Sequence, residues 1–405
     1  MKKEFALKIF EAFSIQRWND LIRPFDLVEM DNDAEKMVIA YIIGKYEESK
    51  GARVDWDWII HASLFSLLRK IQLCDIKSPI QRLIKDQYPQ EYIRLNKWVF
   101  SQYSNLIEDN ELYSRFGDFM DSLSGNCLFD QTSELTMRIY RASHKYASFR
   151  ELEMLSVVNE VERYDGIKKQ LNAELSEYLD LKGLQLLMTR QKPFEFLMRV
   201  EQLRFQTRWN QTPRVPKTSV LGHCFFVAIL TLLFTKECGK KITGKRLYND
   251  YFSALFHDLP ESVTRDIISP VKTATDGLPD VVKTIEEKVV AQELVPLMEE
   301  FYRDEIMYFT SDEFSNRVIV EGCLVKADFD EINSRYSEDT FNAIDGRLVR
   351  LSDHYAALME ADLSIRHGIT SAHLVSGRDN LLSAYADNHN VNGIDASSLF
   401  QDFAG

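Results

Sequence analysis

The sequence contains few residues that interrupt helices and no framework of paired cysteines. Only 16 glycines and 10 prolines occur among 405 residues, and no glycine-rich loop follows a run of strand-forming residues. This argues against a parallel sheet that binds nucleotides. The five cysteines are scattered without a Cys-x-x-Cys pair, which is typical of reduced thiols rather than of disulfides or a zinc ribbon. We therefore expect a cytoplasmic protein.

Long apolar runs and an excess of positive charge are missing as well. The longest apolar run, residues 224–234, has 11 residues, whereas a helix needs about 20 to cross a bilayer. Charged residues interrupt each apolar stretch near the N-terminus, so we expect no signal peptide. The formal net charge of −13 disfavours a protein that neutralises a phosphate backbone, although a local basic pocket is compatible with it. We expect neither a membrane nor an extended nucleic acid as partner.

The sequence is rich in helical periodicity. Apolar residues recur at spacings of three and four, as in residues 151–190, and no Ser/Gly-rich linker divides the chain. Such spacing is typical of amphipathic helices. We predict an all-α protein in which residues 224–234 form a buried helix.

An internal repeat divides the chain. The tripeptide Arg17-Trp18-Asn19 recurs as Arg208-Trp209-Asn210, an offset of 191 residues (208 minus 17), and the same offset aligns residues 64–79 with 255–270 at seven identities in sixteen positions. Tryptophan, aspartate and proline do not recur merely because two regions are helical. We predict two homologous halves, residues 1–190 and residues 191–405.

The second half carries candidate metal ligands. His223 precedes the pair His257-Asp258, and Asp328 follows about seventy residues later. A lone histidine in an apolar helix is more often a hydrogen-bonded core residue, so the joint pattern matters more than any member. Two imidazoles and two carboxylates suit a borderline divalent metal and leave coordination positions for water and a phosphate oxygen.

These residues resemble the HD-domain metal-dependent phosphohydrolases, whose pattern is His, then His-Asp, then a distant Asp. Residues 255–272, with Arg208-Trp209 upstream, are similar to the bacterial 5′-deoxynucleotidase branch. The resemblance implies tandem HD-type helical bundles and a divalent metal (Co, Mn, Ni, Fe, Zn or Mg) bound in the second. It also implies hydrolysis of the 5′-phosphate of (deoxy)ribonucleoside monophosphates through a metal-activated water. The family commonly has an acidic residue before its first histidine, where this chain has Gly222.

The resemblance assigns further roles around the metal. Glu261 would orient or deprotonate the water, or protonate the leaving oxygen, as the catalytic residue. Arg208 offers a planar fork for phosphate, Trp209 a flat face for the sugar or base, and Asp266 and Lys272 complete the substrate-binding set. The residue types of Arg208, Trp209 and Asp266 recur in the first half at the offset of 191 residues. Purely structural roles for these three residues therefore stay open.

The first half lacks the ligands. At the 191-residue offset Asn32 replaces His223, Ser66-Leu67 replaces the His-Asp pair, and Lys70 replaces Glu261. A shift of six brings Ser143 opposite Asp328. We predict a degenerate, non-catalytic first domain that could pack on the second as a built-in partner, giving a monomer with internal pseudo-symmetry or a homodimer.

Two other functions fit the same residues. An HD site could instead cleave nucleoside triphosphates, guanosine tetraphosphate or cyclic nucleotides. The chain could also bind nucleotides without turnover, although the complete ligand set argues against that. In each case the partner is a small-molecule nucleotide.

Overall fold

The segments with helical periodicity form helices, which confirms the prediction of an all-α fold. The computed structural model describes residues 1–404 except residues 75, 77, 125–130, 266–274, 276 and 388. The helices of the first half follow in this order: α1 (Lys3–Phe10), η1 (Glu11–Phe13), α2 (Glu29–Ser49), α3 (Trp56–Leu73), α4 (Ser78–Gln87), α5 (Pro89–Ser101), α6 (Asn110–Ser122), α7 (Gln131–Leu155), α8 (Val161–Ser176) and α9 (Lys182–Met188).

The second half is also helical and adds two short antiparallel strand pairs, β1 with β2 and β3 with β4. Its elements are α10 (Lys192–Phe205), α11 (Val220–Glu237), α12 (Gly244–Phe256), α13 (Glu261–Thr264), α15 (Leu278–Val289), η2 (Val290–Leu294), η3 (Val295–Leu297), α16 (Glu300–Thr310), β1 (Arg317–Val320), β2 (Cys323–Lys326), α17 (Phe329–Asn333), η4 (Asp339–Phe341), α18 (Gly346–Arg366), α19 (Ala372–Ala384), β3 (Asn390–Val391), β4 (Ile394–Asp395) and α20 (Ala396–Gln401).

Helix α11 lies at the centre of the molecule. By length and composition it could cross a membrane, but 89% of it is buried inside the protein. It packs against α12 and α18 of its own half and against α2 of the first half. Ser219 caps α11, Thr243 caps α12 and Asp345 caps α18, each accepting a hydrogen bond from a backbone N–H of the first turn. These three caps fix where the helices that carry the candidate site begin.

Backbone features recur between the halves at the offset of 191 residues. Trp18 and Trp209 both have a positive φ, 57° and 55°, although neither is glycine. An isolated β-bridge precedes α2, and its counterpart precedes α11. Helix α2 begins at Glu29 and α11 at Val220 (220 minus 29 is again 191). The strained turn before the central helix therefore has the same geometry in both halves.

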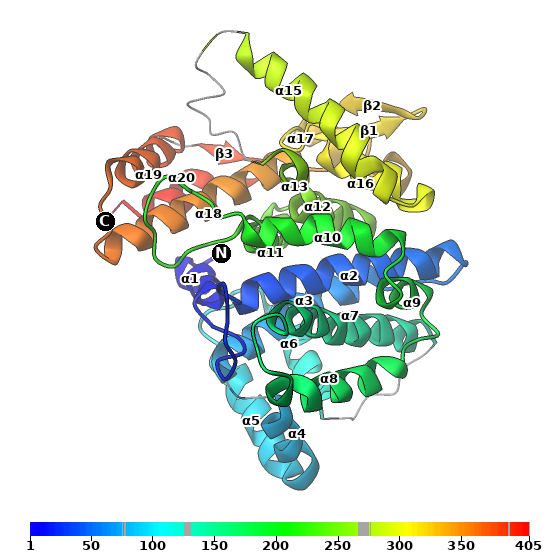
Figure 1. The fold of residues 1–405 in the computed structure, drawn as a ribbon. Coiled ribbons are helices and arrows are strands. Elements are labelled where there is room, and N and C mark those ends of the chain that lie inside the picture. Colours follow the sequence, from blue (N-terminus) through cyan, green and yellow to red (C-terminus); the bar gives the residue numbers. More distant parts are fainter. Residues whose placement is uncertain are drawn as a thin grey trace.

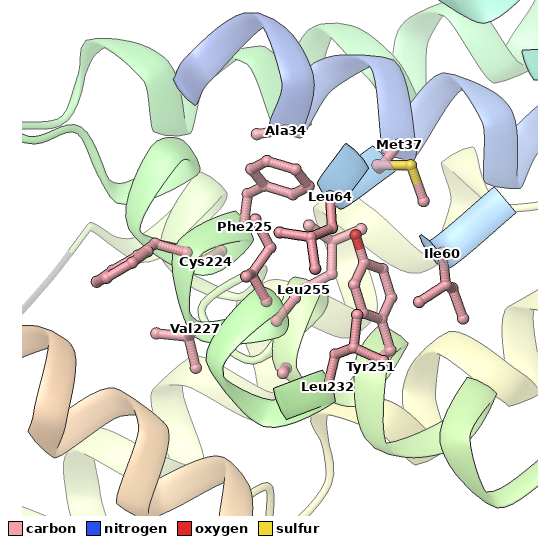
Figure 2. Close-up of a cluster of buried hydrophobic side chains, with 14 of the residues drawn as sticks. Ala34, Met37, Ile60, Leu64, Cys224, Phe225, Val227, Leu232, Tyr251 and Leu255 are labelled. Atoms are coloured by element: carbon pink, nitrogen blue, oxygen red, sulfur yellow. The ribbon is translucent and has the colours of Figure 1, made fainter. Parts of the chain in front are cut away.

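The two halves meet along α2 and α11, which lie side by side in the middle of Figure 1. The first-half helices lie on one side of this contact and most second-half helices on the other. A single hydrophobic cluster contains residues of both halves. Figure 2 shows side chains from the two halves interdigitating, namely Ala34, Met37, Ile60 and Leu64 with Phe225, Val227, Leu232, Tyr251 and Leu255.

Candidate metal centre

His223 lies in the first turn of α11 and faces α18. Its side chain is fully buried, and its Nε2 is 2.9 Å from Oδ1 of Asp353. Its Nδ1 is 3.4 Å from Oε1 of Glu360, two turns further along α18. A carboxylate behind a histidine fixes the tautomer and orientation of the imidazole. Glu360 thus supplies the carboxylate that Gly222 lacks in the sequence.

His257 and Asp258 follow the last turn of α12, and together with His223 they form the cluster that the sequence predicts. Nδ1 of His257 donates to the carbonyl oxygen of Ala254 at 2.7 Å, which turns Nε2 towards the cluster. Nε2 is 3.3 Å from Oδ2 of Asp258. The rings of the two histidines are 5.6 Å apart. A donor hydrogen bond at Nδ1 leaves Nε2 as the atom available to a metal.

The donor atoms form two overlapping groups that share His257, each compact enough for one cation. Single ligand atoms of His223, His257 and Asp353 all lie within 4.8 Å of one another, and the same holds for Cys224, His257 and Asp258. Nε2 of His257 and Oδ2 of Asp258 are buried without a hydrogen-bond partner in the described part of the chain. Unpaired buried polar atoms are costly, and a divalent cation would satisfy them. The residues present therefore fit a metal site.

The cluster is closed on the histidine side and open on the carboxylate side. The histidine side chains are at most 1% exposed, whereas those of Asp258 and Asp353 are 17% and 18% exposed. Burial alone would raise the pKa of Asp353, but the hydrogen bond and charge of His223 and the charge of Arg208 hold it well below its ordinary value. Burial likewise would lower the pKa of His257, and the charge of Asp258 instead raises it well above the usual range. The carboxylates are thus ionised and accessible.

Arg208 lies beside this open face. Its guanidinium nitrogens are 3.6 Å from Asp258, 3.7 Å from Asp353 and 3.4 Å from Glu360. The indole N–H of Trp209 donates to Oε2 of Glu360 at 2.9 Å. Arg208 therefore points at both carboxylates of the cluster, and the Trp209 indole is tied to the same buried glutamate.

Glu360 joins the site to the turn before α11. It is 1% exposed, accepts a hydrogen bond from the hydroxyl of Thr218 at 2.8 Å, and has Arg214 3.8 Å away. Burial would raise the pKa of Glu360, but the charges of Arg208 and Arg214 hold it well below its ordinary value. The sequence prediction missed this residue and Asp353. Their spacing of seven (360 minus 353) within an apolar helix was the available signal, because residues seven apart share a helix face.

Asp328 is not in the cluster, which corrects the predicted fourth ligand. It caps α17, where its Oδ1 accepts from the backbone N–H of Glu331 at 2.8 Å and the Glu331 carboxylate accepts from its own N–H at 2.9 Å. This reciprocal capping box engages the side chain at an exposed position. Asp353, and not Asp328, lies beside the two histidines among the described residues.

The structure gives fewer contacts for the other predicted site residues. Glu261 begins α13, and its charge contributes to the raised pKa of Arg208, which burial alone would lower. Asp266 and Lys272 lie outside the described residues. Glu313, which the sequence prediction did not name, lies near enough to His257 and Asp258 for their charges to act on it, while burial raises its pKa.

The equivalent position in the first half has the same Arg-Trp-Glu contacts but lacks the candidate metal ligands. Arg17 and Trp18 both donate to Oε2 of Glu151 at 2.8 Å, as Arg208 and Trp209 contact Glu360. Glu151 follows His144 by seven residues, as Glu360 follows Asp353. His144 is therefore the counterpart of Asp353, whereas the sequence comparison paired Ser143 with Asp328.

Lysines neutralise the carboxylates of that first-half centre. Nζ of Lys70, the counterpart of Glu261, is 2.9 Å from Glu29 and 3.1 Å from Asp33. Lys36 also pairs with Asp33, and both side chains are fully buried. Asn32, the counterpart of His223, is buried as well. Internal ammonium groups thus stand where a cation would otherwise be needed to balance the charge.

Comparison with known proteins supports the class of the second half. Residues 200–381 match the family model described as HD domain. No curated protein matches the chain. The HD-domain match, which includes the histidines, Asp258 and Asp353, supports a metal-dependent phosphohydrolase that uses a divalent metal.

Proposed function

We propose that the chain removes the 5′-phosphate from (deoxy)ribonucleoside monophosphates. The observation that carries this proposal is the position of Arg208, whose nitrogens lie 3.6 Å and 3.7 Å from the two carboxylates of the metal-binding cluster. A guanidinium is a permanently charged fork that binds phosphate through two hydrogen bonds. A phosphate bound at the cluster would therefore meet Arg208.

The residues around the cluster would have different roles in the reaction. His223, His257, Asp258 and Asp353 would hold the cation. A bound divalent cation would activate water at neutral pH and offset negative charge on the phosphoryl oxygens. Arg208 would orient the phosphate, and Trp209 would fix Arg208 through their shared partner Glu360. Glu261 would transfer the proton, a role supported by its electrostatic contact with Arg208.

Phosphate release from purified full-length protein tests this proposal. The protein would be loaded in turn with Mn, Co, Ni, Fe, Zn or Mg and offered nucleoside monophosphates, triphosphates, guanosine tetraphosphate and cyclic nucleotides. We expect metal-dependent release of inorganic phosphate from monophosphates. His257→Ala and Glu261→Ala should abolish it, whereas His373→Ala, at an exposed position on α19, should not.

The products separate the other functions. Release of pyrophosphate or triphosphate would indicate the alternative phosphohydrolase substrates. Nucleotide binding without turnover under any metal would indicate a sensor. Equal activity in the wild type and in His257→Ala would contradict a reaction at this centre.

We also propose that the first half is a degenerate duplicate of the second and acts as its built-in partner. The shared turn geometry before α2 and α11 and the repeated Arg-Trp-Glu anchor support a common origin. Burial of α11 against α2 supports the partner role. Light scattering should then give the mass of one chain, and a tight dimer that formed through the α2–α11 face would contradict it.

A further inference from the structure

A hollow of about 750 Å³ lies next to the metal-binding cluster, between α17, the start of α18 and the segment after α16. The side chain of Phe314 lies between the hollow and the cluster. Its ring is 6.0 Å from the ring of His257, and the guanidinium of Arg350 lies 5.8 Å from its centre. Arg350 precedes Asp353 by three residues on α18, about one helical turn. The hollow is therefore within one side chain of the cluster.

Two arginines line this hollow without an acidic partner. Arg347 and Arg350 are both exposed. No carboxylate of the described residues lies within 4.0 Å of either guanidinium, although the same chain forms many ion pairs elsewhere. In a protein with a net charge of −13, two uncommitted guanidinium groups side by side create a local site for an anion.

The acidic residues that share the hollow are occupied. The carboxylates of Asp328 and Glu331 accept hydrogen bonds from each other's backbone N–H in the capping box of α17. Asp330 lies 3.9 Å from Lys240 and points to solvent. Lys326, the third cation of the hollow, is 3.4 Å from Asp312. Arg347 and Arg350 are thus the cations of the hollow that have no carboxylate partner among the described residues.

The wall that carries the arginines is held in place. Asn316 Oδ1 accepts from the backbone N–H of Arg347 at 3.0 Å, and Asn392 donates both to Asn316 and to the capping residue Asp345. These contacts fix the first turn of α18. A site built on a rigid helix loses less entropy when a ligand binds.

We propose that Arg347 and Arg350 bind a second phosphate group of the substrate, apart from the one that is hydrolysed. This inference rests on the proposed function, because it assumes that the reacting phosphate lies at the cluster beside Arg208. The preferred substrates are then nucleotides with two phosphate groups, one at the cluster and one in the arginine-lined hollow. The chemistry of hydrolysis stays that of a phosphate monoester or a terminal phosphate.

Steady-state kinetics of the manganese-loaded full-length protein test this inference. A nucleoside 5′-monophosphate would be compared with the 3′,5′-bisphosphate and the 5′-diphosphate of the same nucleoside. Hydrogen bonds to charged groups contribute enough that we expect a KM about tenfold lower for one of the doubly phosphorylated substrates. Arg347→Gln/Arg350→Gln should remove that advantage and leave kcat and the KM for the monophosphate within about twofold.

Arg335→Gln is the matched control. Arg335 is exposed, lies against Tyr336 and does not line the hollow, so its loss removes one positive charge, as each substitution in the double variant does, without touching the site. An equal loss of activity towards mono- and bisphosphate in the double variant would overturn the inference. So would a wild type that does not distinguish the substrates.

Equilibrium binding separates this inference from the proposed function. Calorimetric titration of the bisphosphate into Glu261→Gln protein does not depend on turnover. Tighter binding of the bisphosphate than of the monophosphate, lost in the double arginine variant, supports the pocket even if no substrate is hydrolysed. Binding that is unchanged by loss of both arginines refutes the pocket, whatever the enzyme hydrolyses.

Discussion

Asparagine substitutions at Asp353 and Asp328 distinguish the fourth ligand that the structure indicates from the one that the sequence predicts. Asp353 Oδ1 lies 2.9 Å from His223 Nε2 and belongs to a set of ligand atoms within 4.8 Å of one another. Asp328 is engaged in the cap of α17. We expect Asp353→Asn to lose the metal and Asp328→Asn to keep it.

The expected magnitudes follow from what each side chain contacts. Loss of a residue that only supports a ligand costs about 10–100-fold in metal affinity, so loss of the charged ligand itself should cost at least about 100-fold, or roughly 2.7 kcal/mol. Asparagine caps helices about as well as aspartate, so Asp328→Asn should change the free energy of unfolding by less than about 0.5 kcal/mol.

Elemental analysis after dialysis against a fixed free concentration of Co²⁺ measures the outcome. We expect one metal ion per chain in the wild type and in Asp328→Asn, because Lys70 and Asn32 stand in the counterpart centre of the first half. Asp353→Asn should hold much less than one. Thermal unfolding of the metal-free proteins checks that each variant is folded. Full metal content in Asp353→Asn, or its loss in Asp328→Asn, would refute the assignment.

Three further substitutions probe the contact between the halves and the anchor of the site. A Cβ at Gly222 would lie 2.4 Å from Oδ1 of Asp31 and 2.9 Å from Phe13, so Gly222→Ala should lower the free energy of unfolding by about 1–3 kcal/mol in urea titrations. Burial raises the pKa of Asp31 from 3.8 to about 6. The folded state therefore binds the carboxyl proton more tightly than the unfolded chain does. The free energy of unfolding should fall as the pH rises from about 4 to about 6. Asp31→Asn should remove this loss, which urea unfolding would detect as a gain of about 3 kcal/mol at pH 8 and little change at pH 4. Glu360→Gln leaves the guanidinium groups beside it without their carboxylate. It should lower the free energy of unfolding by about 3 kcal/mol, measured by thermal unfolding, and weaken metal binding. An unchanged unfolding midpoint would argue against Glu360 as the anchor of Trp209.

The sequence predicts the helical fold and three members of the candidate cluster, His223, His257 and Asp258, from features that lie close together in the chain. Periodic apolar spacing specifies helices, and His257-Asp258 is a dipeptide whose position at the end of α12 brings it to His223 once α11 and α12 pack together. The arrangement of these residues does not depend on distant segments of the chain.

The place of Asp353 beside the histidines depends on how α18 packs against α11. Asp328 and Asp353 both follow the His-Asp pair at distances compatible with the motif, but only α18 packs along α11. Asp328 follows the β1–β2 pair and begins a short separate helix. The same limit applies to the first half, where the sequence pairs Ser143 with Asp328 (328 minus 143 is 185), whereas the Glu151–Glu360 correspondence pairs His144 with Asp353 (353 minus 144 is 209). Which face of a long helix meets the core is decided by tertiary contacts.

The contact between Asp31 and Gly222 makes the two halves complementary to each other. The two residues occupy equivalent positions (222 minus 31 is 191) and meet where α2 packs on α11, with Asp31 accepting a hydrogen bond from the N-cap hydroxyl of Ser219 at 2.5 Å. Two side chains cannot share that space, because even a Cβ at position 222 would lie within 2.4 Å of the carboxylate. Two copies of the first half would bring two buried carboxylates together, and two copies of the second half would lose the hydrogen bond to the cap of α11. The arrangement is therefore complementary only between unlike halves. The contact leaves a buried carboxyl with a raised pKa in the first half, which lacks the candidate ligands. In return it fixes the start of α11, the helix that carries His223.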